Sequence, residues 1–206
     1  MYLSRLTLIT FILLIFFSCK TKNSTTHSNT PTTYSSISDF LKHEMESTKV
    51  DFDLVHKNLK LYGTSPKDPD AMSTTEVDAQ LVREGVEHFE QKKYSDCVSK
   101  VAQITLSAPL FSTAQYVNAF AFFKQNKLER AAEIFGGMFQ YESMYKNLNR
   151  EELGWMNVYT RYLMFQKNES DVQKKALDNA IDLYLEKIDN SEGVFYNKVI
   201  TLKGFL

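Results

Sequence analysis

The chain has 206 residues, of which 43% are hydrophobic and 24% are charged. This composition is typical of a globular protein rather than a disordered one, and the length predicts one domain of ordinary size once processed segments are removed. Lysine and arginine number 24, against 25 for aspartate and glutamate. The near balance excludes the basic excess by which proteins attract nucleic acid, so no nucleic-acid partner is expected.

The N-terminal stretch up to Cys19 predicts an export signal. Arg5 supplies positive charge, and the run from Leu6 to Phe17 is apolar apart from two threonines. A membrane span needs roughly 20 apolar residues, so this shorter run suits the apolar region of a signal peptide better than a transmembrane helix. Residues 1–19 are therefore predicted to form a signal segment that ends at Cys19.

The residues from Phe16 to Cys19 resemble a bacterial lipobox. In that motif a small residue precedes a cysteine whose thiol receives a lipid, and here Ser18 precedes Cys19. Phe17 departs from the motif, which usually has a small residue there. The resemblance implies a palmitate-type lipid anchor at Cys19. Lys20 replaces the aspartate that retains some lipoproteins in the inner membrane. The expected location is thus the bacterial outer membrane, with the domain facing the periplasm. A plain signal peptide with a coincidental cysteine, or a short uncleaved anchor, is the alternative.

Residues 20–36 predict a disordered tether, because most of them are Ser or Thr and almost none is apolar. Residues 37–72 follow as an N-terminal segment that ends in a loop over residues 63–70. Within it, Ser38 is a possible helix cap for a face that carries Phe40, Leu41 and Met45. Val50, Phe52 and Leu54 alternate as in a strand, but we favour helix because the pattern downstream is helical.

Residues 73–206 predict an all-α domain. The tetrapeptide Ser73-Thr74-Thr75-Glu76 has the form of a capping box at a helix start. Hydrophobic periodicity then predicts helices over residues 73–91, 94–106, 112–124, 128–141, 151–166, 171–188 and 194–206.

Two stretches of this domain repeat each other at a fixed 34-residue spacing. Six positions pair small with small or apolar with apolar side chains: Gly85, Phe89, Tyr94, Cys97, Val101 and Ile104 with Ala119, Phe123, Leu128, Ala131, Phe135 and Met138. A fixed period of this length indicates a stacked helix-turn-helix array, whose usual role is to hold other proteins.

These residues resemble the tetratricopeptide repeat (TPR), in which small residues let paired helices approach and large residues fill the space around them. The resemblance implies a TPR-like array of about two to three repeats. A third unit aligns with an insertion in its turn and places Ala176 and Ala180 at small positions. The residues expected to pack the repeats are Gly85, Tyr94, Cys97, Pro109, Ala119, Leu128 and Ala131.

In that family the first helices of successive pairs line a concave groove for a partner's segment. Carried onto this chain, the resemblance implies a partner-binding groove formed by Val82, Val86, Phe89, Tyr116, Phe120, Phe123 and Lys124. Large aromatic side chains make good anchors at such surfaces. The alternative is that the aromatic residues fill the core between repeats.

Three smaller features complete the pattern. Gly136 and Gly137 fall inside an expected helix, where each glycine lowers helix stability by about 1 kcal/mol relative to alanine. Close packing, an early helix end or a hinge would explain their presence. Cys97 is expected to be a buried, unreactive thiol. The segment 194–206 is strongly apolar and is expected to dock on the preceding repeat or on another protein.

No catalytic constellation is present in the sequence. The four histidines lie far apart, and there is no phosphate-binding glycine loop, nucleophile elbow or zinc motif. We therefore expect no enzyme activity, cofactor or metal. The hypothesis is a lipid-anchored adaptor or scaffold that binds a protein partner in the cell envelope. The alternative is a glycan-binding or small-ligand-binding lipoprotein of a nutrient-uptake system.

Overall fold

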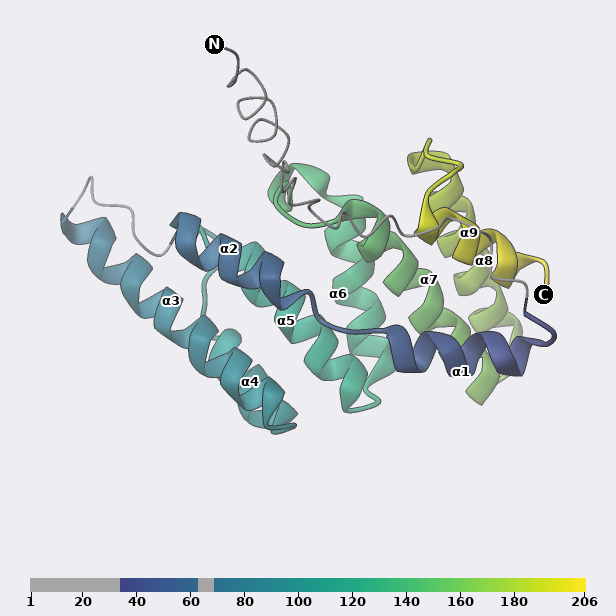
Figure 1. Cartoon of the computed structure of the whole chain (residues 1–206), viewed down its shortest axis with the longest axis horizontal. Helices are drawn as coiled ribbons and strands as arrows, with labels where there is room; N and C mark the ends of the chain where they lie inside the picture. The colour runs from purple at the N-terminus through teal and green to yellow at the C-terminus, as the bar shows by residue number, and fades with distance from the viewer. Residues whose placement is uncertain (1–33, 63–68) are drawn as a thin grey trace, which may run out of the picture. The chain divides into compact units, whose positions relative to one another are not determined.

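The computed structural model describes residues 34–62 and 69–206, which belong to one compact unit (Figure 1). The expected export signal, Cys19, residues 20–33 of the expected tether and most of the expected loop at 63–70 lie outside the described residues. Every regular element within the described ranges is a helix, so the predicted all-α class is confirmed there.

The observed helices lie close to the residue ranges predicted for them. The helices are α1 (Ile37–Ser47), α2 (Phe52–Tyr62), α3 (Pro69–Glu90), α4 (Tyr94–Val101), α5 (Phe111–Lys124), α6 (Leu128–Gln140), α7 (Arg150–Lys167), α8 (Asp171–Lys187) and α9 (Val194–Lys203), with a short 3-10 turn η1 (Glu142–Met144). From α3 to α8 each helix packs against the next, and α9 packs against α7 and α8.

The N-terminal segment is helical, as favoured, and contains no strand within residues 34–62. Ser36, not Ser38, caps α1, because its side chain accepts a hydrogen bond from the Asp39 backbone amide. The predicted apolar face is wrong at one position: Met45 is exposed, whereas Glu44 is buried in its place. Glu44 lies one helical turn after Phe40 and so shares its side of the helix.

Two predicted helix boundaries are also wrong. Helix α3 begins at Pro69, ahead of the expected capping box at Ser73. The ring of proline fixes a backbone angle that suits the first helical position, and its missing amide hydrogen is not needed there. Helix α4 ends at Val101 rather than near Leu106.

The turns within the α3–α4 and α5–α6 pairs have the same backbone geometry at equivalent positions of the repeat. Lys92 and Asn126 both adopt the left-handed conformation, with φ of 60° and 61°. Each amide donates to the carbonyl three positions earlier, Lys92 to Phe89 and Asn126 to Phe123, at 2.9 Å in both turns. The 34-residue spacing seen in the sequence is therefore present in the backbone of these two turns.

Small residues permit the close helix contacts. A Cβ atom on Gly85 would lie 2.5 Å from Val101 Cγ1, so glycine is needed where α3 meets α4. A Cβ atom on Gly154 would lie 2.6 Å from the Tyr184 ring and 2.8 Å from the Phe139 ring, where α7 meets α8 and α6. The sequence reasoning missed Gly154, although it follows Ala119 by close to one repeat length and continues the series of small positions.

The residues expected to pack the repeats mostly lie in the core. Gly85, Cys97, Ala119, Leu128 and Ala131 are buried. Tyr94 is half-buried, and its ring lies 5.1 Å from that of Phe89, centroid to centroid. Pro109 is exposed in the connection between α4 and α5. Burial raises the pKa of the Cys97 thiol to about 12, as expected for an unreactive cysteine.

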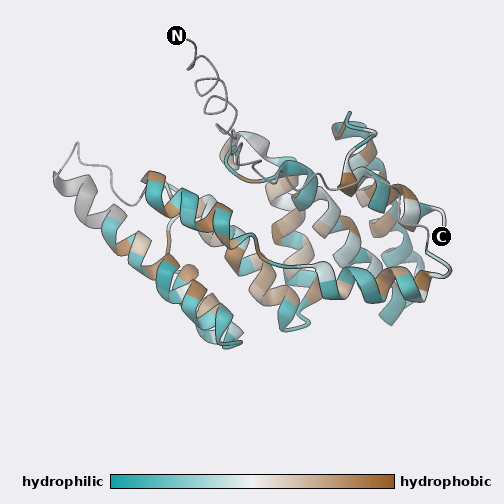
Figure 2. Ribbon diagram, viewed as in Figure 1, coloured by the Kyte–Doolittle hydropathy of each residue, from teal (hydrophilic) through white to brown (hydrophobic). Residues whose placement is uncertain are grey.

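Helix α5 is buried around most of its circumference. Its residues from Ser112 to Phe123 are buried apart from Gln115 and Phe122. Helices α5 and α6 carry many hydrophobic residues, whereas α2 alternates hydrophobic and hydrophilic ones along its length (Figure 2). A helix that is apolar all round must be covered on every side. On one side of α5 the cover comes from the N-terminal segment.

Candidate functional site

The residues of the predicted groove come from α3 and α5, and one of them, Phe120, packs its ring against Phe135 of α6 within the array. Val82, Val86 and Phe89 lie on α3, and Tyr116, Phe120 and Phe123 lie on α5. All six are buried, with at most 8% of their surface exposed, and Lys124 at the end of α5 is half-buried. The chain's own residues 34–62 contribute to this burial, and we call them the covering segment.

Aromatic and aliphatic side chains attach the covering segment to the array. Phe40 of α1 packs edge-on against Trp155 of α7, with ring centroids 6.0 Å apart. Phe52 of α2 packs edge-on against Phe89 of α3, at 5.9 Å. Between and after these anchors, Val50, Val55 and Leu59 are buried. The covering segment thus uses its apolar residues along both helices and the link between them.

The link between α1 and α2 is held through its backbone. Lys124 Nζ donates to the Thr48 carbonyl oxygen at 3.1 Å. The Asp51 amide donates to the Tyr116 hydroxyl, also at 3.1 Å. Two of the predicted groove residues therefore bind main-chain groups of a polypeptide, and such contacts do not depend on the side chains of the segment that is bound.

Tyr116 connects the link to a carboxylate on α7. Its hydroxyl donates to Glu152, with distances of 3.2 and 3.1 Å to the two carboxylate oxygens. Burial raises the pKa of Glu152 to about 7; the charge of Asp51 adds to this effect, while the Tyr116 hydrogen bond and Lys198 oppose it. Burial, with the nearby Glu152 charge, also raises the pKa of Tyr116.

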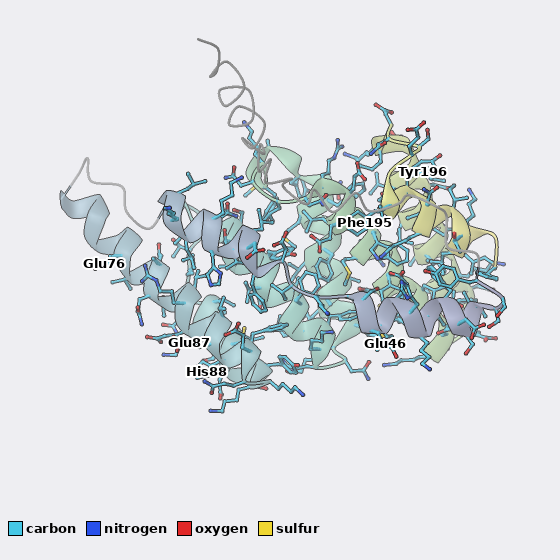
Figure 3. The ribbon with its side chains drawn as sticks, in the orientation of Figure 1. Glu46, Glu76, Glu87, His88, Phe195 and Tyr196 are labelled. Carbon is cyan, nitrogen blue, oxygen red and sulfur yellow. The ribbon has the colours of Figure 1, made fainter. Side chains whose placement is uncertain are left out.

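A buried ion pair joins the covering segment to the C-terminal helix. Glu44 of α1 is fully buried, and its Oε2 lies 2.8 Å from Lys198 Nζ of α9. The Lys198 ammonium group also lies 5.6 Å from the centre of the Trp155 ring and 5.4 Å from that of Phe195, which Figure 3 labels on α9. These rings stabilise the cation where it is partly removed from water.

The cavity beside this pair is small. Lys198, Glu152, Trp155 and Phe195 are among the side chains that line a volume of about 130 Å³. Sites for small-molecule substrates usually begin at roughly 300 Å³. The arrangement suits the attachment of one polypeptide segment to another better than the binding of a substrate.

Sequence reasoning missed three charged residues that hold the covering segment or lie beside it: Glu44, Glu152 and Lys198. Glu44 carried a usable signal, because it lies at helical spacing from Phe40 although it is charged. Glu152 and Lys198 carried none, since each is an ordinary charged residue on a helix until the fold brings it beside Tyr116 or Glu44.

The described residues contain no cluster of three or more His, Cys, Asp or Glu side chains arranged to hold a metal ion. Among the same residues, His43, His56 and His88 lie on three different helices. None of the described helices is both long enough and apolar enough to cross a membrane.

Comparisons of the chain with known protein families, with curated proteins and with solved structures find no significant match.

Proposed function

We propose that the chain is a non-catalytic, lipid-anchored adaptor of the bacterial cell envelope, which binds a protein partner on the face formed by α3, α5 and α7. The proposal includes a TPR-like array of two to three helix pairs and an anchor at Cys19. The identical turns at Lys92 and Asn126 support the array, because stacked repeats reuse one turn geometry at a fixed spacing.

One observation carries the proposal: this face already holds a polypeptide. Lys124 and Tyr116 bind the backbone of the link between α1 and α2, while Phe89 and Trp155 contact its flanking aromatic residues. Contacts to main-chain groups give affinity for a polypeptide of any sequence, and pockets for aromatic side chains add specificity. A partner segment with the same pattern, an aromatic residue on each of two helices joined by a short link, would fit the face.

The covering segment would then compete with the partner. Binding on the face requires at least part of residues 34–62 to leave it, so the apparent affinity falls by the fraction of time that the face is covered. Weakening the covering segment without changing the face should increase partner binding.

Phe52→Ala is the variant that tests this competition. It removes the ring that contacts Phe89 and leaves every residue of α3, α5 and α7 in place. Leu61→Ala is the matched control, because Leu61 lies on the same helix and is 56% exposed. Crosslinking in cells, affinity purification and mass spectrometry should recover an envelope protein several-fold more strongly with Phe52→Ala than with the wild type or Leu61→Ala.

A synthetic peptide of residues 34–62 sharpens the experiment. Added in excess before crosslinking in isolated envelopes, it should reduce recovery of the partner by competing for the same face. Equal recovery from all three chains, or no envelope protein recovered with a folded Phe52→Ala chain, would contradict the adaptor function.

The lipid anchor is tested separately with the two cysteines. Metabolic labelling with an alkyne fatty acid should label the wild type and Cys97→Ser, and Cys19→Ser should lose the label. Cys97 serves as the control because it is buried in the helical domain. A wild type that takes up no label would favour a plain signal peptide or an uncleaved anchor, and label that persists in Cys19→Ser would place the lipid on another residue.

A further inference from the structure

A hollow of about 400 Å³ lies among α6, α7 and α8, and none of its lining residues belongs to the covering segment. Its volume falls within the range of small-molecule sites, roughly 300–1,000 Å³. Gly136 and Gly137 of α6 line it, together with Asn157 and Arg161 of α7 and Leu183 of α8. It is therefore a candidate site that the adaptor function does not use.

The two glycines keep this hollow open. A Cβ atom on Gly136 would lie 3.1 Å from Asn157 Oδ1, so glycine leaves room for that amide. A Cβ atom on Gly137 would meet nothing within 4 Å, so close helix packing does not require glycine there. Each glycine costs about 1 kcal/mol against alanine in a helix. Glycine at position 137 leaves open space beside the Asn157 amide and the Arg161 guanidinium group, which line the same hollow.

Asn157 and Arg161 present unused hydrogen-bond donors to this space. Asn157 is 3% exposed, and its Oδ1 accepts from Arg161 Nε at 3.0 Å. In residues 34–62 and 69–206, no hydrogen bond uses Asn157 Nδ2, and the two terminal guanidinium nitrogens of Arg161 make neither a hydrogen bond nor an ion pair. Asn157 Nδ2 is not among the side-chain atoms buried without a partner, so this donor is accessible from the hollow that Asn157 lines. The two side chains together offer a planar set of donors that suits a carboxylate.

The other groups around the hollow define the rest of the ligand. Glu133 of α6 lines it and stays near enough to Arg161 to raise that residue's pKa, against the stronger lowering by burial. Glu133 also pairs with the exposed Arg130 at 2.9 Å, so its second oxygen remains for another cation. Leu183 and Ala180 supply an apolar wall. The site thus offers donors for an anion, an acceptor for a cation and an aliphatic surface.

We propose that this hollow binds a free aliphatic α-amino acid. Arg161 and Asn157 hold its carboxylate, its ammonium group faces Glu133, and its side chain lies against Leu183. A zwitterion matches the opposite charges of Arg161 and Glu133 and leaves the site without net charge. This site is independent of the proposed adaptor face and would persist if no protein partner bound there.

Calorimetric titration of the full processed chain tests the proposal, with L-alanine, L-valine and L-leucine as the probes. At least one should bind saturably, and its C-terminal amide and its N-acetyl derivative should each bind at least tenfold more weakly. Those derivatives lack the carboxylate and the ammonium charge respectively. No binding of any of the three up to about 10 mM, where a millimolar Kd is measurable, would overturn the proposal.

Two variants place the ligand in the hollow. Arg161→Gln removes the guanidinium group, with Arg83→Gln, an exposed arginine on α3, as its matched control. Gly137→Leu fills the space from a position where an added Cβ meets no atom within 4 Å, so the chain should stay folded with a melting temperature no lower than that of the wild type. Both should weaken binding at least tenfold while Arg83→Gln leaves it unchanged. Binding that survives in folded Gly137→Leu would overturn the assignment to this hollow.

Discussion

Glu152 gives the protein a stability that depends on pH. Burial raises the pKa of this carboxyl from 4.5 to about 7. The folded protein therefore holds the proton more tightly than the unfolded chain does. The charged form of Glu152 destabilises the fold: this penalty is absent below about pH 4.5, grows between pH 4.5 and 7, and is complete above pH 7.

The size of the penalty follows from the pKa difference. One pKa unit corresponds to about 1.4 kcal/mol, so the change from 4.5 to about 7 corresponds to roughly 3 kcal/mol. Glu152→Gln has nearly the same shape, can still accept the hydrogen bond from Tyr116 and carries no charge. At pH 8 this variant should be more stable than the wild type by up to about 3 kcal/mol, and the difference should disappear near pH 4.

Urea unfolding followed by circular dichroism, repeated from pH 4 to pH 9, measures this difference. The wild type and Glu152→Gln share every other titrating group, so subtracting their unfolding free energies isolates this one carboxyl. A difference that stays constant with pH would refute the reasoning, because it would mean that Glu152 has the same pKa in the folded and unfolded states. A variant less stable at pH 8 than at pH 4, relative to the wild type, would reverse the sign and refute it as well.

Three further substitutions test the packing. Gly154→Ala adds a methyl group against two buried rings and should destabilise the fold by about 1–3 kcal/mol, whereas Gly137→Ala meets no neighbour and should stabilise it by up to about 1 kcal/mol. Similar melting temperatures for the two variants would contradict these contacts. Lys198→Met leaves Glu44 buried without its counter-charge and should lower the free energy of unfolding, measured in urea, by about 3–5 kcal/mol. The double variant with Glu44→Gln should recover much of that loss, and no recovery would mean that the two residues are not coupled. Lys92→Gly relieves a left-handed backbone and should raise the unfolding free energy by about 1 kcal/mol, and a loss of stability would argue against that conformation.

The helices and their pairing were predictable because they depend on local patterns. Apolar residues at helical spacing place α5 and α6 within one residue of the expected ranges. The small residues at Gly85 and Ala131 report where two helices touch, and such contacts recur at a fixed interval in the chain. The starts of α1 and α3 were harder to predict, since Ser36 and Pro69 compete with equally good signals at Ser38 and Ser73.

The candidate site was only half predictable. The sequence places Phe89, Tyr116 and Lys124 on one face, because their positions on successive first helices follow from the repeat. It does not indicate that residues 34–62 lie over that face, since nothing local in Phe40 or Phe52 records that they meet Trp155 and Phe89.

Local patterns were enough to predict the helical class, the 34-residue spacing of two helix pairs and an export signal, because each depends on residues close together in the chain. Which side chains are covered and which charges meet became known from the packed helices. Glu44 and Lys198 are 154 residues apart and form a buried ion pair, and Asn157 faces the space left by Gly136. Such contacts depend on how whole helices pack, so no local pattern of residues predicts them.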